Sequence, residues 1–388
     1  MNIKLSAEKY NDYIIERRRF YHSIPELSFE EKRTTAELAA DLKKLGIEVE
    51  TFPDYPGLVG TIKGKTEGKT VMLRADIDAL PVEEHTGLPY ASCNGKMHAC
   101  GHDAHISMLL GAAKILSEMK GELKGTIKLL FQAAEESCYG AKYYVEKGVL
   151  DGVDAVFGMH VWGTLDAPYF NLEAGNRMAS VDNFKITVKG VSSHGSAPHL
   201  GKDAVVAASS IIMNIQTLVS RINDPLNPLV VSIGTIKGGQ RFNIIANNVE
   251  MEGTVRTHSR EARAIIEQSL REIIEGTAKS LGCEAVLEYS YYAAPIINEH
   301  DDINKIVQNA AAKLYGEDSM VKMPMLMGSE DFAYLMEKVP GFYGFIGTKN
   351  EEKGIIYPNH NDKFTVDEEV LHRGSALYAQ FAHDFLEK

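Results

Sequence analysis

The sequence predicts an α/β protein: an α/β/α sandwich around a mixed, largely parallel sheet, with a ferredoxin-like domain inserted into it. Three observations support this. Strand-like and helix-like runs alternate up to residue 180, an order typical of parallel sheets covered by helices. From 181 to 294 the order becomes βαββαβ, which is the ferredoxin-like arrangement. The alternation then returns, so residues 1–180 and 295–388 are expected to form one discontinuous domain.

The chain opens on two predicted helices. Residues 6–23 place apolar and aromatic side chains at helical spacing, and Pro25 ends that helix. Ser28 and Glu31 then have the spacing of a capping box, in which two side chains bond to backbone amides at the start of a helix. The helix that follows is expected to end at Gly46, because glycine commonly terminates helices.

Alternating elements follow as far as residue 180. The expected elements are strands 47–52, 58–64 and 70–78, helix 106–119, strand 126–132, helix 141–148 and strand 154–161. The tract GKTEGKT at 64–70 has one step too few between its glycines for a phosphate-binding loop, and it does not precede a helix. We therefore expect a hairpin turn there and no nucleotide site.

The insert and the end of the chain complete the pattern. In the insert the expected elements are strand 183–190, helix 203–222, strands 228–239 and 247–258, helix 261–281 and strand 284–293. After Pro295 they are helix 301–315, a helix after GSED, strand 342–347 and helix 367–387.

The composition excludes several classes of function. The formal net charge of -12 argues against a general binder of nucleic acid or anionic membranes, because both surfaces would repel the protein. Four cysteines are too few and too scattered for a disulfide scaffold. Neither a signal peptide nor an apolar run of about 20 residues is visible. We expect a cytoplasmic protein with reduced thiols.

Metal-ligating side chains gather at the ends of predicted strands. They are Asp76 and Asp78 at the end of the third strand, Glu135 and Glu136 after the fourth, His160 in the fifth, Cys100 and His102 in the loop MHACGHDAH, and His360 in the turn YPNHND. Each alone has an ordinary explanation, such as a solvated helix start or a surface turn. Because ligands gather at the carboxyl ends of strands in open α/β sheets, their coincidence predicts a metal site.

The number of candidate ligands predicts two ions. Cys100, His102, Glu136, His160 and His360 exceed the three protein ligands of a catalytic zinc, and a thiolate can bridge two ions. Adjacent side chains diverge, so Glu135 is expected to stay off the metal as the general base, with Asp78 orienting a ligand. Cys100 as a thiol nucleophile is the alternative, since a histidine lies two residues away.

These motifs resemble the co-catalytic metallo-amidohydrolases that include carboxypeptidase G, aminoacylase, hippurate hydrolase and the plant indole-acetyl-amino-acid hydrolases. The resemblance is strongest to the amidohydrolase branch, which also holds N-acetyl-amino-acid deacetylases. RADIDALP, MHACGHDAH, AEE, FGMH, SSHGSAPH, FNIIAN, VRT, GSEDF and PNHND occur in family order over nearly the whole chain. The resemblance implies a binuclear catalytic domain, with 181–294 as an inserted lid or dimerisation domain.

The resemblance also assigns roles to single residues. It makes Cys100 the bridging ligand, and we expect His102 and His160 at one ion and Glu136 and His360 at the other. The broader family has a metal histidine where this chain has Asp76, so the ion that each terminal ligand serves stays open. In the insert, His194 corresponds to a residue that reaches the substrate carbonyl across a dimer. Asn243 and Arg256 match substrate-binding positions.

The function implied is hydrolysis of N-acyl amino acids to a carboxylic acid and a free amino acid. The expected cofactors are two divalent ions per subunit, zinc first, with manganese, cobalt or nickel as alternatives. The expected partners are a small-molecule substrate and a second copy of the chain. A dipeptidase or aminopeptidase on the same scaffold, or a non-catalytic metal- or ligand-binding protein, are the alternatives. The sequence leaves the acyl group and the side chain open.

Overall fold

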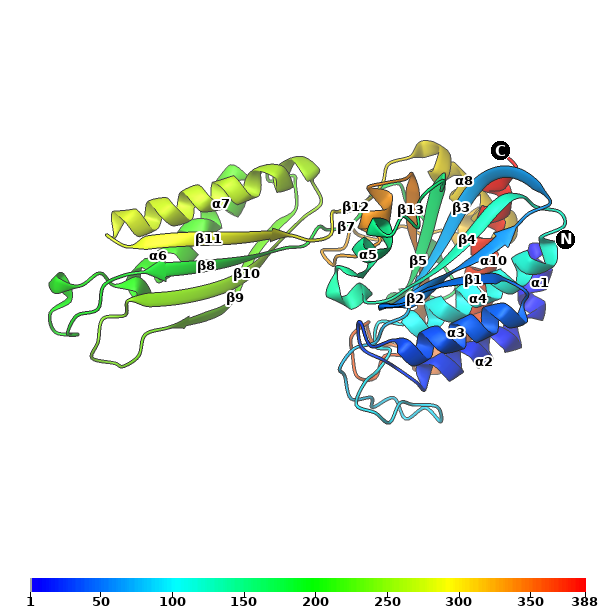
Figure 1. The fold of residues 1–388 in the computed structure, drawn as a ribbon, viewed down its shortest axis with the longest axis horizontal. Coiled ribbons are helices and arrows are strands. Elements are labelled where there is room, and N and C mark those ends of the chain that lie inside the picture. Colours follow the sequence, from blue (N-terminus) through cyan, green and yellow to red (C-terminus); the bar gives the residue numbers. More distant parts are fainter. Residues whose placement is uncertain (1) are drawn as a thin grey trace. The chain divides into compact units, whose positions relative to one another are not determined.

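The computed structural model describes residues 2–388, in which the chain forms two compact units (Figure 1). Unit 1 comprises the described part of Met1–Arg177 together with Ile297–Pro324 and Asp331–Lys388. Unit 2 comprises Met178–Ile296 and the short segment Met325–Glu330, which the sequence had assigned to the first domain. The functional labels of the two domains remain predictions.

Unit 1 is built on a mixed sheet that is parallel at its centre. Across the sheet the strands are β1 (Glu48–Phe52), β2 (Tyr55–Lys63), β4 (Lys124–Gln132), β3 (Thr66–Asp76), β5 (Ala155–Asp166), β13 (Gly341–Lys349) and β6 (Phe170–Asn171). Strands β4, β3, β5 and β13 are parallel, whereas β1, β2 and β6 pair antiparallel. This confirms the predicted fold class. The hairpin expected at 64–70 is wrong, because β4 lies between β2 and β3.

The helices of unit 1 pack on this sheet (Figure 1). They are α1 (Ile3–Lys9), α2 (Asn11–His22), α3 (Lys32–Lys44), α4 (His102–Met119), α5 (Gly140–Glu146), α8 (Asp301–Tyr315), α9 (Ala333–Met336) and α10 (Leu371–Leu386). Helix α4 is buried along most of its length and packs against α2, α10 and strand β3, so it is a core helix. The first turn of α4, which begins at His102, is therefore held by a well-packed helix.

The single helix expected over 6–23 is two helices, α1 and α2. They meet at Tyr10, where the backbone leaves the helical region at φ -96° and ψ 12°. The Tyr10 hydroxyl donates to Glu118 of α4. The break keeps apolar residues on the buried side of both helices, so periodicity alone does not reveal it.

The capping box expected for Ser28 and Glu31 is also wrong. Helix α3 begins at Lys32, and its first backbone amides donate to the carboxylate of Glu26, at 2.8 Å for Thr34. The side chains of Ser28 and Glu31 instead reach residues that are distant in the sequence. The spacing of Ser28 and Glu31, which resembles a capping box, therefore belongs to two residues that make tertiary contacts.

Unit 2 has the predicted ferredoxin-like topology. Its elements are β8 (Asp182–Lys189), α6 (Ala204–Thr217), β9 (Leu229–Gly238), β10 (Asn248–Thr257), α7 (Arg260–Ser280) and β11 (Glu284–Tyr291). The strands lie in the order β11-β8-β10-β9 and pair antiparallel. Helix α6 continues as η3 (Leu218–Ile222), and Ala204–Ile222 is long and apolar enough to cross a membrane by length and composition alone. In this fold it packs on its own sheet through Ile211 and Ile215.

Two short strands, β7 (Gly175–Met178) and β12 (Ile296–Asn298), pair with each other and were not predicted. Neither is long enough to show an alternating pattern of apolar residues.

Candidate metal centre

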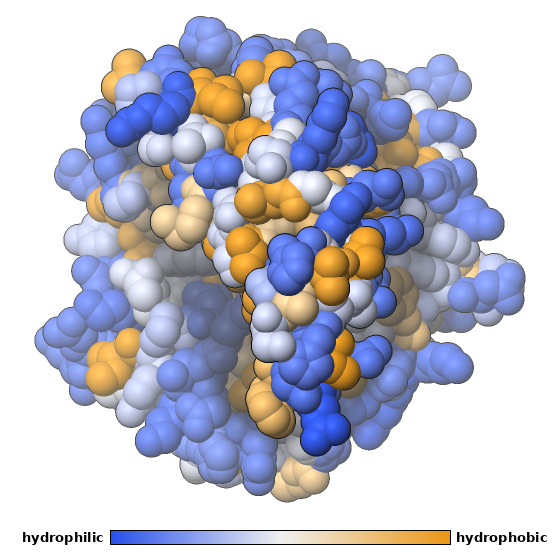
Figure 2. Space-filling view, turned by 90° about the vertical axis from the view of Figure 1, so that its left-hand side faces the viewer, coloured by the Kyte–Doolittle hydropathy of each residue, from blue (hydrophilic) through white to orange (hydrophobic). Residues whose placement is uncertain are grey.

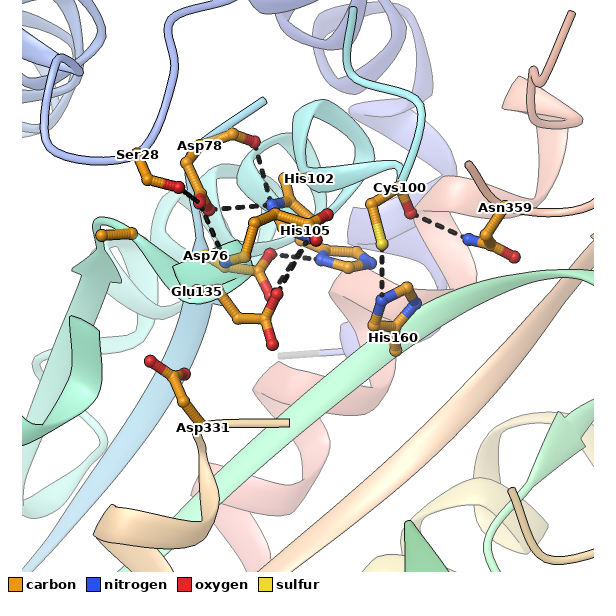
Figure 3. A network of polar contacts seen from close by, with 12 residues as sticks. Ser28, Asp76, Asp78, Cys100, His102, His105, Glu135, His160, Asp331 and Asn359 are labelled. Carbon is orange, nitrogen blue, oxygen red and sulfur yellow. Dashed lines mark hydrogen bonds and ion pairs between the residues drawn. The ribbon is translucent and has the colours of Figure 1, made fainter. Parts of the chain in front are cut away.

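The predicted ligands come together beside the carboxyl ends of β3 and β4, and Figure 3 shows Cys100, His102 and His160 of this group. The sequence had placed His160 at the end of its strand, but β5 (Ala155–Asp166) continues beyond it. Cys100 precedes α4 and His102 begins it, while His160 lies in β5, Glu136 follows β4, and His360 lies in the loop after β13. Two sets of donor atoms that lie within 4.8 Å of one another contain Cys100: Cys100, His102 and His160, and Cys100, Glu136 and His360. Glu135 also lies this close to His102 and Glu136. The sulfur of Cys100 belongs to both sets.

Each histidine of the first set directs its Nε2 toward the cluster, while its Nδ1 makes a hydrogen bond. His102 Nδ1 lies 2.9 Å from the Asp78 carbonyl oxygen and 3.1 Å from Asp78 Oδ1. His160 Nδ1 lies 2.6 Å from the Val161 carbonyl oxygen. Because a carbonyl only accepts, both Nδ1 atoms carry a proton, which leaves both Nε2 atoms as the ring nitrogens that could bind a metal ion. This is the orientation that metal-binding histidines require.

Two buried atoms of the cluster have no hydrogen-bond partner among the described residues: His102 Nε2 and Glu136 Oε1. His102 Nε2 lies 3.7 Å from Asp76 Oδ2 and 3.8 Å from both Glu135 Oε2 and Glu136 Oε1. Buried polar atoms are normally paired, so an orphaned nitrogen facing carboxylates needs an explanation. Thiolate, imidazole and carboxylate donors suit divalent ions such as zinc, and the residues present therefore fit a metal pair.

The electrostatics of the cluster also call for a cation. Burial, followed by Glu136, Glu135 and Asp76, raises the pKa of the Cys100 thiol well above its ordinary value. Burial would lower the pKa of His102, but the neighbouring carboxylates raise it to about 10. A reactive thiolate needs positive surroundings. With carboxylates around it, Cys100 lacks what the nucleophile alternative requires, whereas a bound cation would favour the thiolate.

A second layer of buried polar groups supports the ligands and was missed in the sequence. Asp76 Oδ1 accepts a hydrogen bond from His105 Nδ1 at 2.5 Å, and Arg74 pairs with Asp76 Oδ2 at 2.7 Å. His105 Nε2 accepts the backbone N–H of Val161 at 2.9 Å, so both of its ring nitrogens are occupied. Arg74 also pairs with Asp331 of the GSEDF motif at 3.0 Å. The third histidine of MHACGHDAH, one helical turn after His102, was the available signal.

Another buried group of charges lies behind the metal loop. Asp103 Oδ2 lies 2.8 Å from Arg18 Nε and 2.7 Å from His22 Nδ1, and His22 Nε2 lies 3.0 Å from Glu84 Oε1. Burial and Arg18 would lower the pKa of His22, but the two carboxylates raise it. The group ties α2 to the first turn of α4, which carries His102.

The substitution Glu84→Gln is expected to make the free energy of unfolding depend less on pH in the acidic range. Burial would raise the pKa of Glu84, but its hydrogen bond to His22 lowers it from 4.5 to about 2. A carboxyl group with a depressed pKa adds stability above its unfolded pKa, and this stability is lost as the pH falls toward 2. At about 1.4 kcal/mol per tenfold change in proton affinity, at most about 2 kcal/mol of this stability would be lost between pH 7 and pH 3.

Urea unfolding of the metal-free protein at pH 7 and pH 3 measures this effect. The difference in unfolding free energy between the two pH values should shrink in Glu84→Gln. The matched control is Glu83→Gln, an exposed neighbour that should keep the wild-type difference. An equal difference in all three proteins would contradict the assignment.

The other predicted site residues lie in unit 2. His194 is exposed, and its Nδ1 accepts the backbone N–H of Ser196 at 3.2 Å, which leaves the proton on Nε2. A backbone hydrogen bond of 2.8 Å joins the loop of His194 to Asn243. Arg256 donates to Ser329 Oγ at 3.1 Å. The donor sets lie in unit 1, so the roles of these three residues remain proposals.

Comparisons with known proteins agree with the geometry. A sequence model of peptidase family M20/M25/M40 matches residues 72–384. Thermostable carboxypeptidase 1 of Saccharolobus solfataricus is 41% identical over 100% of this chain and 98% of its own length. N-acetylcysteine deacetylase of Bacillus subtilis is 39% identical over 99% of both chains. A Bacillus subtilis structure described as a dinuclear metal binding peptidase from the M20 family matches with a TM-score of 0.87 and 37% identity, over 98% of this chain and 99% of that one.

Proposed function

The chain belongs to peptidase family M20/M25/M40 and is a hydrolase of that family; from this premise and its candidate metal centre, we propose that it hydrolyses the amide bond of N-acyl amino acids. One observation carries the proposal. Two donor sets share Cys100 Sγ, and the carboxylate of Glu135 lies beside them, 3.8 Å from His102 Nε2. A pair of metal sites with an adjacent carboxylate is what hydrolysis by activated water requires.

The proposed ligand assignment follows the two sets. Cys100, His102 and His160 would hold one ion, and Cys100, Glu136 and His360 would hold the other, with Cys100 common to both sets. Zinc is the first expectation, since it takes nitrogen and sulfur ligands, with manganese, cobalt or nickel as alternatives. When bound, such ions polarise a carbonyl group and acidify water.

The protein's own residues handle the protons and the orientation. Glu135 takes a proton from the attacking water and returns it to the amine nitrogen as the C–N bond breaks, which releases a carboxylic acid and a free amino acid. Asp78 holds His102 in the tautomer that its role requires. In unit 2, the Nε2–H of His194 suits stabilisation of the developing oxyanion, and Arg256 suits pairing with the substrate carboxylate.

A dipeptidase or other peptidase activity is the second candidate, and the carboxypeptidase-named relative favours it. Both reactions can release an amino acid with a free carboxylate, so they differ in what lies on the acyl side. The deacetylase-named relative supports the acyl substrates.

A substrate panel separates these functions. The protein, loaded in turn with zinc, manganese, cobalt and nickel, is incubated with N-acetyl amino acids, hippurate, indole-acetyl amino acids and dipeptides. Turnover of the acylated amino acids with higher kcat/KM than of dipeptides is expected. Faster turnover of dipeptides would favour the peptidase, and no turnover at all would favour a metal- or ligand-binding protein.

We also propose that the chain forms a homodimer through the edge of unit 2 made by α6 and β9. Strand β9 is at the edge of its sheet, and Met213 of α6 and Leu226 before β9 are 69% and 87% exposed. Figure 2 shows apolar groups among the hydrophilic ones on the face that it views. Edge strands with exposed apolar neighbours are prone to pair with another chain.

Sedimentation is expected to give twice the 42.8 kDa of one chain. Met213→Lys should produce monomers, because it places a charge in the proposed interface. Ile265→Lys on α7, which is also exposed, is the matched control and should leave the dimer intact. A monomeric wild type, or a dimer in both variants, would contradict the proposed edge.

The expected cytoplasmic location remains a proposal. Its support is that the four cysteines, Cys93, Cys100, Cys138 and Cys283, are too few and too scattered for a disulfide scaffold.

A further inference from the structure

The segment between α2 and α3 fastens two loops of the candidate metal centre. Ser28 Oγ donates to Asp78 Oδ2 at 2.7 Å, and Figure 3 shows this contact. Glu31, which is 0% exposed, reaches the other loop, where its Oε1 accepts the backbone N–H of Ala134 at 2.7 Å. The two residues that resemble a capping box in the sequence therefore hold the loops after β3 and β4.

Ala134 has a backbone conformation that needs support. It lies in the left-handed region, with φ 60° and ψ 38°, which costs an alanine roughly 1–2 kcal/mol. The residue turns the chain at the end of β4, directly before Glu135. Any acceptor that fixes its N–H also fixes the direction in which Glu135 leaves the strand.

Side chains from other segments hold the amides on both sides of Ala134. The N–H of Ala133 donates to Tyr144 Oη at 3.0 Å, and the N–H of Glu136 donates to Asp78 Oδ2 at 3.0 Å. Glu31 supplies the contact between these two. Without it, the buried amide of the strained residue would lose its acceptor, at a cost of about 1–3 kcal/mol.

We propose that Glu31 is a positioning residue for Glu135: its carboxyl oxygen holds Ala134 in the left-handed conformation and so directs the Glu135 carboxylate toward the metal cluster. The proposal rests on the function proposed for Glu135 as the base. Glu31 itself acts only through Ala134.

The contact needs an acceptor oxygen and does not need a charge. Burial, with Asp78 nearby, raises the pKa of Glu31 to about 8 and so favours its neutral form. The amide oxygen of glutamine can take the same place. Methionine has nearly the same length and volume but no comparable acceptor, so Glu31→Gln and Glu31→Met form a matched pair.

Kinetics of the metal-loaded variants on the best substrate of the panel test the proposal. Glu31→Gln is expected to keep kcat within about threefold, whereas Glu31→Met should lose about 10–100-fold in kcat, the usual effect of removing a supporting contact, with KM nearly unchanged. Metal content should be two ions in both variants. Glu31→Asp, which keeps the carboxyl group but is one methylene too short, should behave like Glu31→Met and replaces it if the methionine variant does not fold.

Amide hydrogen exchange of the metal-free proteins gives a readout independent of activity. Peptides covering 133–138 should exchange about tenfold faster in Glu31→Met than in the wild type, and at the wild-type rate in Glu31→Gln. If the wild type hydrolyses nothing in the panel, the proposed function fails, while exchange still decides whether Glu31 holds Ala134. Wild-type kcat and exchange in Glu31→Met, or an equal loss of kcat in Glu31→Gln, would overturn the proposal.

Discussion

Glu135→Gln is expected to lower kcat by about 10²–10⁴-fold while two metal ions stay bound. Glutamine keeps the shape of the side chain but cannot take a proton from water. Glu135 belongs to neither of the two sets that contain Cys100, so the donors of both these sets remain in place. Steady-state kinetics on an N-acyl amino acid, together with metal analysis of the same sample, measure both parts of this result.

The neighbouring residue is the matched control. Glu136→Gln removes a donor from the set of Cys100, Glu136 and His360. We expect this variant to lose one ion and activity together, whereas Glu135→Gln loses activity alone. Near-normal kcat in Glu135→Gln would show that another group is the base, and loss of metal in that variant would make Glu135 a ligand.

Cys100→Ser is expected to lose tight binding of both ions and to reduce kcat below about 1% of wild type. Its sulfur is the donor that the two sets share, 3.3 Å from both His160 Nε2 and His360 Nε2. Serine is smaller, and its neutral hydroxyl is a much weaker ligand than a thiolate. Supporting residues alone change metal affinity by about 10–100-fold, so loss of the shared donor should cost at least that for each ion.

Metal analysis after dialysis and calorimetric titration with zinc measure this effect. His360→Ala, which removes a donor from one set only, should keep one ion and so separates a shared ligand from a terminal one. Binding of metal should also raise the melting temperature of the wild type far more than that of Cys100→Ser, because a ligand that binds only the folded state stabilises it. Two ions in Cys100→Ser, bound as in the wild type, would contradict the bridging assignment.

Long elements of the fold could be predicted because their periodicity reflects burial. Helix α8 was expected at 301–315 and is found at Asp301–Tyr315. The βαββαβ order of the insert likewise led to the right topology for unit 2. The failures were local: the break at Tyr10, the short strands β7 and β12, and the neighbours of the tract at 64–70. Periodicity records which face of an element is buried, and it does not record which strands become neighbours.

The chemistry of the candidate site could be predicted in part for a different reason. Metal-competent residues at the ends of three strands, and Cys100 and His102 before α4, indicate ligands whatever their partners are, since strand ends meet at one sheet edge. No comparable sequence pattern indicates the hydrogen bonds and ion pairs that support the ligands. Nothing in the sequence links His105 to Asp76, or Asp103 to Arg18 and His22.

The sequence by itself determined the kinds of donor atom, the alternating order of the elements, and the adjacent pair of glutamates from which base and ligand are proposed. The tertiary structure alone decided which atoms face the cluster: the tautomers of His102 and His160, the occupation of both nitrogens of His105, and the use of Ser28 and Glu31 on distant loops. The physical reason is that a hydrogen bond joins atoms close in space. A buried side chain bonds to whichever partner the fold brings within about 3 Å, and sequence spacing predicts that partner only within a single helix or turn.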